Sequence, residues 1–436
     1  MNAAVSHGTA RSRRLLVLTP RFPYPVIGGD RLRIHRLCAE LSREYSLTLL
    51  SLCETREELT APVPRDGVFD TVRRILLPPW RSLVNCLLAL PTRTPLQVAY
   101  YRCREFARAV EELAPSHDAV LCHLVRTAEY ALPLRMPKVL EMTDAISLNY
   151  ERVGVHRSPL PFMNAIYRLE RARIHRLERT IVDRFDLSLL VSEVDRSYLF
   201  GVDPVRSARV LVCSNGVDTD LLHFCPARTG HQIAMIGNLM SVQNLDAADW
   251  FARAVLPRIS AEYADATFKV VGRIREADAM RLEGLPGVTV TGTVASVEQA
   301  TSSAAVGVCP VRLGAGIQNK VLEYMALGLP CVTTRVGLEG LAAVPGRDLL
   351  VATSPEEMAA AVRWLFAHPD QARCIALAAR RYVEERHCWR AMVEPLLRML
   401  DARLGVPVLR PSRPETMPAG QAAIPSAARF RMPSGP

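Results

Sequence analysis

The chain has 436 residues, more than one compact core usually holds, so we expect two domains. Its composition, 49% hydrophobic and 22% charged, argues against a disordered chain, and the sequence shows neither a repeat period nor an apolar run long enough to span a bilayer. The formal net charge of +10 is carried almost entirely by arginine, because only three of the 54 basic residues are lysine.

The first half of the chain opens with a strand, a helix and a second strand. Residues 15–19 are a short apolar run that Pro20 ends, apolar residues then recur at helical spacing over 34–41, and 47–52 is a second apolar run. This order predicts a parallel sheet with helices on its faces. Further apolar runs predict strands at 119–122, 139–142 and 187–191.

A strongly charged helix is predicted over residues 168–185. Its arginines and carboxylates can pair along a solvated helix, or its cations can form a surface that faces an anionic membrane. The first interpretation is the simpler one, and the second stays open.

The second half repeats the alternation more clearly. Strands are expected at 233–237, 268–271, 288–291, 306–310 and 330–333, and helices over 247–255, 317–327, 355–367, 369–386 and 389–400. Gly328 is expected to end the helix at 317–327. The alternation breaks at 215–228, where we place the hinge between the domains.

Cysteine usage and the N-terminus indicate a cytoplasmic protein. The 11 cysteines form no CxxC pair, which argues against a zinc ribbon or a disulfide framework. The first apolar run is too short for a signal peptide. The simpler interpretation of the arginine excess is a codon bias of the source, and the alternative is attraction to nucleotide or lipid phosphates. No nucleic-acid-binding signature accompanies the positive charge, so we expect no nucleic-acid partner.

Two glycine-rich turns could hold a ligand. Gly28 and Gly29 follow the first strand, where backbone can approach a phosphate or sugar closely, although any tight turn favours glycine. Gly314 and Gly316 precede the helix at 317–327, whose first N–H groups are free to bind a diphosphate.

Two charged residues of the helix at 317–327 could complete a nucleotide site. The carboxylate of Glu323 can accept two hydrogen bonds from a ribose diol, and Lys320 can meet a phosphate. The alternative is an ordinary surface pair three residues apart.

Together these features resemble the family 4 glycosyltransferases, which are retaining enzymes with the GT-B fold. The likeness rests on Glu323, Met325-Ala326 and Gly328-Leu329-Pro330, and covers residues 14–400. It continues at Pro23, Pro25, Gly28-Gly29-Asp30, Asn215-Gly216-Val217-Asp218, Gly237, Asn244-Leu245-Asp246-Ala247, Val271-Gly272-Arg273 and Val290-Thr291-Gly292. The segments FPYP, GGDRLR and GIQNKVLE are most similar to sugar transferases of bacterial exopolysaccharide and exosortase (PEP-CTERM) systems.

The resemblance implies an α/β protein of two facing Rossmann-like domains with a central cleft. Residues 14–215 would hold the acceptor, 228–385 the nucleotide-sugar donor, and the helix at 386–402 would pack back toward the first domain, with 1–13 flexible and 405–436 a disordered tail. The implied activity is a retaining hexosyltransferase acting on a polysaccharide or lipid-linked acceptor in exopolysaccharide biosynthesis. The place would be the cytoplasm, with peripheral contact at the inner membrane face.

The resemblance also assigns residues. His123 would lie near the transferred sugar as the catalytic histidine, unless it is only a histidine at a strand end, and Glu323 would be the second glutamate of an E-x7-E motif. No metal or cofactor is expected, because Asp118 and Asp144 stand alone rather than in a DxD pair. The implied donor-binding residues are Gly28, Gly29, Gly237, Arg273, Arg312, Gly314, Gly316, Ile317, Lys320 and Glu323.

Three positions depart from the family pattern. The first glutamate of E-x7-E falls at Ala315, and the usual diphosphate-binding Arg and Lys fall near Asn238 and Gln243. Arg273, Arg312, Lys320 or the loop N–H groups must then offset the leaving-group charge. A non-catalytic nucleotide-sugar-binding subunit and a GT-B-type sugar-nucleotide epimerase are the alternatives.

Overall fold

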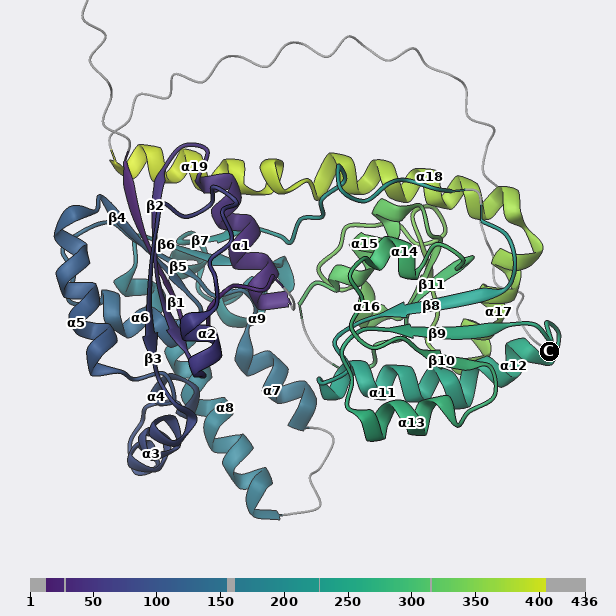
Figure 1. Cartoon of the computed structure of the whole chain (residues 1–436), viewed down its shortest axis with the longest axis horizontal. Coiled ribbons are helices and arrows are strands. Elements are labelled where there is room, and N and C mark those ends of the chain that lie inside the picture. The colour runs from purple at the N-terminus through teal and green to yellow at the C-terminus, as the bar shows by residue number, and fades with distance from the viewer. Residues whose placement is uncertain (1–12, 27–28, 155–160, 227, 314–315, 405–436) are drawn as a thin grey trace, which may run out of the picture.

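The computed structural model describes residues 13–26, 29–154, 161–226, 228–313 and 316–404. They form two α/β lobes, each built on a parallel sheet (Figure 1). We call the first lobe the N-domain and the second the C-domain. The sequence predictions that concern residues 1–12, 405–436, Gly28, Gly314 and Ala315 lie outside the described residues.

The N-domain sheet has seven parallel strands in the order β3-β2-β1-β4-β5-β6-β7. They are β1 (Arg14–Thr19), β2 (Ser46–Cys53), β3 (Thr71–Leu76), β4 (Ala119–His123), β5 (Lys138–Glu141), β6 (Leu187–Leu190) and β7 (Val210–Val212). Buried Leu, Val and Ile side chains cover both faces of the sheet, as expected when helices pack on each side. The strands predicted at 15–19, 47–52, 119–122, 139–142 and 187–191 are confirmed; β3 was missed because Arg73 and Arg74 interrupt its apolar pattern.

Ten α-helices of the described N-domain residues surround this sheet. They are α1 (Gly29–Leu41), α2 (Arg56–Thr60), α3 (Pro79–Ala89), α4 (Leu96–Ala99), α5 (Arg104–Leu113), α6 (Val125–Ala131), α7 (Ile146–Gly154), α8 (Pro161–Ile181), α9 (Glu193–Phe200) and α10 (Pro204–Ser207). Within the charged helix α8, Arg173 pairs with Glu170 at 2.9 Å and Arg171 reaches Glu151 of α7 at 2.7 Å. Both arginines are therefore in ion pairs, as the interpretation of this segment as a solvated helix predicted.

The C-domain sheet has six parallel strands in the order β10-β9-β8-β11-β12-β13. They are β8 (Gln232–Ile236), β9 (Thr267–Val271), β10 (Val288–Val290), β11 (Val306–Cys309), β12 (Cys331–Thr333) and β13 (Leu350–Val351). The helices of the C-domain are α11 (Val242–Trp250), α12 (Leu256–Ser260), α13 (Glu276–Glu283), α14 (Val297–Ala300), α15 (Asn319–Leu327), α16 (Arg335–Leu338), α17 (Pro355–Ala367) and α18 (Pro369–Arg386), with a π-helical turn at Phe251–Val255. The last helix, α19 (Trp389–Leu404), follows α18.

Helix α15 shows how the sequence sets the boundaries of one element. Gly328 has a φ of 72°, the left-handed conformation that ends a helix, and this confirms the predicted stop. The helix starts at Asn319, two residues later than predicted. The Tyr324 hydroxyl accepts a hydrogen bond from Ile236 N at 2.8 Å and donates to Val308 O, which fixes α15 against β8 and β11.

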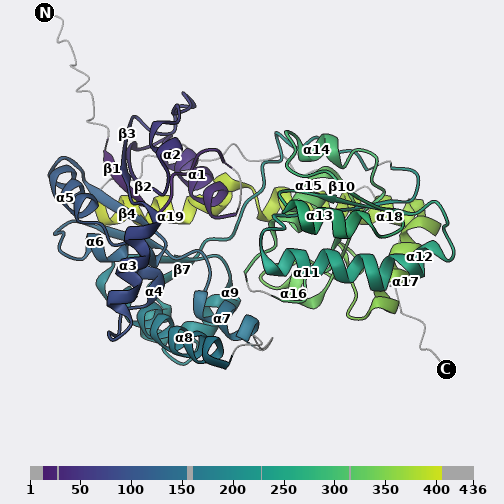
Figure 2. The ribbon, with the colours of Figure 1, turned by 60° about the horizontal axis from the view of Figure 1, so that its bottom comes forward.

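Two segments connect the lobes. The chain passes from β7 to β8 without a strand, and α18 and α19 run from the C-domain back across the N-domain (Figure 2). Val393, Leu396 and Leu400 of α19 enter the same buried cluster as Leu37 and Leu41 of α1. Burying these side chains ties the end of the chain to the N-domain.

Candidate functional site

A cleft of about 360 Å³ lies between the lobes, where the loops after the N-domain strands face the start of α15. Arg21 follows β1, Leu124 follows β4 and Thr143 follows β5, so the carboxyl ends of these parallel strands supply one wall. The other wall comes from the C-domain residues Gly316, Ile317 and Asn319. The remaining lining residues are Gly29, Asp30, Arg33, Arg126, Asp144, Ile146, Val191 and Asn215.

A buried arginine organises the N-domain wall. Arg33 of α1 is 2% exposed, and its guanidinium donates to Glu141 Oε1 at 2.7 Å, Asn215 Oδ1 at 2.7 Å and the carbonyl of Cys213 at 2.8 Å. Asn215 Nδ2 then donates to Asn319 Oδ1 at 2.7 Å, at the first residue of α15. A continuous set of hydrogen bonds therefore joins the N-domain sheet to the N-terminus of a C-domain helix.

His123 belongs to the same set of hydrogen bonds. The register of β4 and β5 places it directly opposite Glu141, and its Nδ1 lies 2.6 Å from Glu141 Oε2. Burial opposes ionisation of Glu141, but the charge of Arg33 and the hydrogen bond from His123 outweigh it and lower the pKa of Glu141 to about 2. Since Glu141 is then a carboxylate and can only accept, the His123 proton sits on Nδ1.

The backbone is strained directly beside these two side chains. Leu124 and Thr143 have φ values of 63° and 65°, which are uncommon for residues with a Cβ. Such conformations cost on the order of 1–3 kcal/mol each and persist where the surrounding structure imposes them. Both residues line the cleft, whereas His123 is 3% exposed and lies behind Leu124 rather than among the lining residues.

Asp144 lines the cleft, although no role was predicted for it beyond its standing alone rather than in a DxD pair. Its Oδ2 accepts from Asn149 Nδ2 at 2.7 Å, and a Cβ added at Gly316 would lie 3.5 Å from the Asp144 Cβ, so it faces the loop before α15. Burial, and then the nearby charge of Asp195, raise the pKa of Asp144 to about 6. The cleft therefore contains a carboxyl group that titrates near neutral pH.

On the C-domain side, two of the predicted donor residues meet at Asn244. Lys320 Nζ donates to Asn244 Oδ1 at 2.5 Å, and a Cβ added at Gly237 would lie 3.1 Å from the Asn244 side chain. Gly272 approaches from the next loop, where an added Cβ would lie 1.8 Å from the Gly237 carbonyl oxygen. Only glycine fits at position 272, so the loops after β8 and β9 are in direct backbone contact.

Glu323 lies one turn after Lys320 and is partly buried. Its carboxylate makes no hydrogen bond or ion pair shorter than 4 Å with any described residue. Burial raises its pKa to about 7, against the opposing effect of the Lys320 charge, and burial lowers the pKa of Lys320 itself. A carboxylate held in this way has unused acceptor capacity, and this suits a diol ligand.

The two predicted arginines differ. The Arg273 side chain is exposed and, among the described residues, its guanidinium has no hydrogen bond or ion pair. Arg312 is bound to Asp246 at 2.6 Å and stacks 5.3 Å over the Trp250 ring. Neither lines the cleft, and of the two only Arg273 has a guanidinium without a partner among the described residues.

The structure thus groups the predicted residues in two places. Gly29, Gly316 and Ile317 line the cleft, whereas Gly237, Arg273, Arg312, Lys320 and Glu323 lie around the carboxyl edge of the C-domain sheet and α15. Sequence reasoning missed Arg33 and Glu141. Two features of the sequence could have indicated them. Arg33 lies four residues before Leu37 and eight before Leu41, so it shares their buried helix face, and Glu141 is the last residue of a buried strand.

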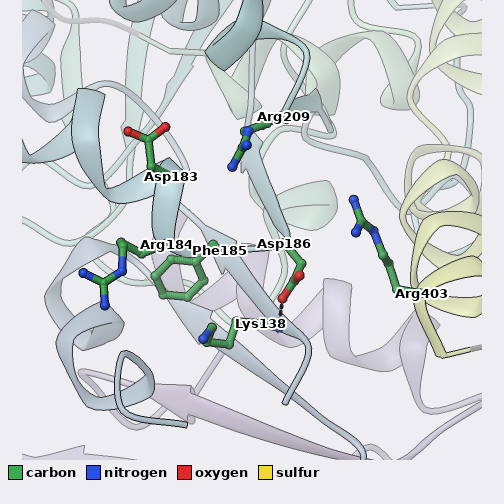
Figure 3. A pocket seen from close by; sticks show the side chains of 7 residues that line it. All are labelled: Lys138, Asp183, Arg184, Phe185, Asp186, Arg209 and Arg403. Carbon is green, nitrogen blue, oxygen red and sulfur yellow. Dashed lines mark hydrogen bonds between the residues drawn. The ribbon is translucent and has the colours of Figure 1, made fainter. Parts of the chain in front are cut away.

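A second pocket, of about 320 Å³, lies at the opposite edge of the N-domain sheet (Figure 3). Lys138 begins β5, Asp186 precedes β6 and Arg209 precedes β7, so this is the amino-terminal edge of those strands. This pocket is separate from the cleft, because the two lie at opposite ends of the strands. Ligands of open parallel sheets usually bind at the carboxyl ends, where the cleft lies. In the described ranges, no group of three or more His, Cys, Asp or Glu side chains could hold a metal ion.

One protein family matches part of the chain. Residues 230–368 match the family described as Glycosyl transferases group 1, which places that pattern in the C-domain. No curated protein sequence matches the chain.

Solved structures resemble both lobes together. Sucrose-phosphate synthase from Thermosynechococcus elongatus is 16% identical over 89% of this chain and 100% of its own, with a TM-score of 0.66. HepE from Anabaena, in complex with UDP and glucose, is 15% identical over 89% and 99%, with a TM-score of 0.63. TarM from S. aureus is 10% identical over 89% and 99%, with a TM-score of 0.65. The chain therefore has the GT-B fold of two Rossmann-like domains, as the sequence resemblance implied.

Proposed function

We propose that the protein is a glycosyltransferase that moves a sugar from a nucleotide-activated donor to a hydroxyl group in the cleft, with retained anomeric configuration. The observation that carries the proposal is Glu323, a partly buried carboxylate without a partner among the described residues, in a domain that matches group 1 glycosyltransferases. A ribose diol would supply the two hydrogen bonds that it lacks. HepE, which was solved with UDP and glucose, has the same fold and supports a nucleotide-sugar donor.

The C-domain residues account for stabilisation of the leaving group. When the bond between the anomeric carbon and the phosphate oxygen breaks, negative charge develops on the diphosphate. The free guanidinium of Arg273, the ammonium of Lys320 and the N-terminal amides of α15 are the groups that can offset it. They would replace the Arg and Lys that the family usually has near Asn238 and Gln243.

The N-domain residues account for positioning. The hydrogen bonds from Arg33 through Glu141 fix the His123 ring, and the route through Asn215 fixes the start of α15 relative to it. Preorganised groups of this kind favour the transition state because they do not reorient during the reaction. The acceptor in this proposal is a polysaccharide or lipid-linked sugar, handled in exopolysaccharide synthesis at the inner face of the membrane.

A thermal-stabilisation experiment tests the donor site. Purified protein is heated with a panel of UDP-, GDP-, ADP- and TDP-sugars, beside Glu323→Ala and the control Glu262→Ala, whose side chain is 59% exposed. We expect one nucleotide class to raise the Tm of the wild type and of the control but not of Glu323→Ala, because binding to the native state stabilises it by mass action. No stabilisation by any member would overturn the proposal, and interconversion of the free donor without an acceptor would favour the epimerase.

A further inference from the structure

Helix α3 presents its apolar side to solvent. Trp80, Leu83, Val84, Leu87 and Leu88 recur at helical spacing and are 45–70% exposed. Five large apolar side chains on one eleven-residue helix are far more than the isolated exposed residues of an ordinary surface. Two further exposed leucines lie nearby: Leu90, which directly follows α3, and Leu169 of α8, which is 49% exposed. The two segments are in contact, because the Leu90 carbonyl accepts a hydrogen bond from Arg173 of α8.

The polar side of α3 faces the protein and holds this orientation. Ser82 and Ala89 are buried, Asn85 Nδ2 donates to the carbonyl of Arg102 at 2.9 Å, and the Cys86 thiol contacts the carbonyl of Leu96 at 3.6 Å. Rotating the helix to bury its leucines would break these hydrogen bonds. The exposure of the apolar face is therefore built into the packing of α3 on α4.

The segment that carries α3 is basic. Residues 77–104 contain Arg81, Arg93, Arg102 and Arg104 and no Asp or Glu. Glu105 lies 3.7 Å from Arg81 and Glu129 lies 2.9 Å from Arg102, whereas Arg93 and Arg104 have no ion pair among the described residues. The Arg81 guanidinium also lies 5.4 Å over the ring of Trp80. Apolar side chains flanked by arginine match the two layers of an anionic membrane surface, acyl chains below and phosphates above.

The position of α3 links this surface to the cleft. β3 ends at Leu76 and α3 begins at Pro79, so α3 projects from the carboxyl edge of the N-domain sheet (Figure 1). The same edge supplies Arg21, Leu124 and Asp144 to the cleft.

We infer that α3, with its flanking arginines, is a docking surface for an anionic lipid bilayer. None of the helices in the described ranges is long and apolar enough to cross a membrane. The inference deepens the lipid-linked acceptor of the proposed function, because docking at this edge brings the cleft to the membrane where such an acceptor would lie. The surface differs from the one predicted from sequence, since Arg171 and Arg173 of α8 are held by carboxylates.

Vesicle binding tests the inference directly. The full chain is sedimented with vesicles of phosphatidylcholine alone and of equal parts phosphatidylcholine and phosphatidylglycerol, over a range of salt. We expect binding to the anionic vesicles that weakens with salt. The double variant Leu83→Asp with Leu87→Asp should bind the anionic vesicles at least about tenfold more weakly than the wild type. Two apolar contacts are replaced by charges that anionic lipid repels. Trp80 fluorescence should shift to the blue with anionic vesicles.

A matched control separates the α3 face from exposed apolar residues in general. Val202 and Val205 are 88% and 69% exposed and lie shortly before β7, at the opposite edge of the sheet. Val202→Asp with Val205→Asp should bind like the wild type. Loss of binding in this control to the same extent, or full binding by the Leu83 and Leu87 variant, would overturn the inference.

Two further readouts keep the conclusions separate. If the wild type is a dimer that the Leu83 and Leu87 variant disperses, while both bind vesicles equally, the face is an interface between copies and the inference is wrong. Stabilisation by the nucleotide-sugar should be unchanged in this variant, which shows that its fold and donor site are intact. Vesicle binding without any nucleotide stabilisation would overturn the proposed function and leave the docking surface standing.

Discussion

The N-domain wall of the cleft and the predicted donor site of the C-domain each depend on a glutamate, and the two glutamates are held in opposite ways. The donor site is the group of Gly237, Gly272, Lys320 and Glu323 at the carboxyl edge of the C-domain sheet and on α15. Glu141 on the N-domain side is fully buried, bound by Arg33, His123 and Thr143, and has a pKa lowered to about 2. Glu323 on the C-domain side has no hydrogen-bond partner among the described residues, and its pKa is raised to about 7. Polar groups whose hydrogen bonds are satisfied make a rigid frame, whereas a group with unused acceptors can still bond to a ligand. The N-domain wall is thus complete without substrate and the donor site is not.

Removing Arg33 should break the N-domain frame and have the largest effect. Arg33→Met leaves the Glu141 carboxylate buried with its main cation gone, and breaking a buried ion pair in this way typically costs about 3–5 kcal/mol. Urea unfolding would measure the loss. The control is Arg31→Met on the same helix, whose pair with Glu58 is partly exposed and should contribute about 1 kcal/mol or less.

The double variant Arg33→Met with Glu141→Gln sharpens this prediction. If the cost arises from the uncompensated carboxylate, the double variant should lose less stability than the two single variants added together. Strict additivity, or an Arg33→Met variant as stable as Arg31→Met, would show that the frame does not depend on this pair.

A methyl group at position 272 should disturb the donor site through its backbone. Gly272 has a φ of 140°, and a Cβ there would meet the Gly237 carbonyl at 1.8 Å, so Gly272→Ala adds a clash to an unfavourable conformation. We expect a loss of about 2–3 kcal/mol in the free energy of unfolding, together with loss of nucleotide binding. Gly346→Ala is the control: its φ is 81° but it has open space, so it should cost only about 1 kcal/mol. Equal losses in the two variants would mean that the loop contact is unimportant.

The fold followed from local pattern far better than the site did. The strand predicted at 15–19 and the helices predicted at 355–367 and 369–386 are present in the structure. They could be predicted because the spacing of apolar residues shows which face of a strand or helix is buried. By contrast, the bonds of Arg33 to Glu141 and to Asn215 join residues separated by 108 and 182 positions. No local pattern specifies such a contact; it arises from how the strands order in the sheet.

Within the candidate site, the positions of the glycine-rich loops could be predicted, whereas the hydrogen-bond partners of the charged side chains could not. Gly29, Gly316 and Ile317 were expected near the ligand and line the cleft. Lys320 and Glu323 were expected as ligands or as a surface pair, and Lys320 instead donates to Asn244 of α11. Whether a charged side chain has a partner depends on the neighbours that the tertiary fold supplies, and spacing alone does not contain this information.

The unpartnered state of Glu323 should appear in the pH dependence of donor binding. With a pKa of about 7, its ionised fraction rises from roughly one tenth at pH 6 to roughly nine tenths at pH 8, so affinity should rise about ninefold over this range. Calorimetry with the stabilising nucleotide-sugar measures this, since a diphosphate diester does not itself titrate there. Glu323→Gln should bind weakly and independently of pH. A flat profile in the wild type would contradict ribose binding by Glu323.

The smallest effect is expected at Arg312, and it separates two cations that the family resemblance treats alike. Arg312 is 43% exposed and its guanidinium is occupied by Asp246, and exposed pairs of this kind contribute about 1 kcal/mol or less to stability. Arg312→Ala should therefore change the Tm little and weaken nucleotide-sugar binding less than Arg273→Ala, which removes a cation with no partner among the described residues. If Arg312→Ala loses as much affinity as Arg273→Ala, the pair with Asp246 must open when donor binds. The donor site would then rearrange around its ligand, and its difference from the preformed N-domain wall would be larger still.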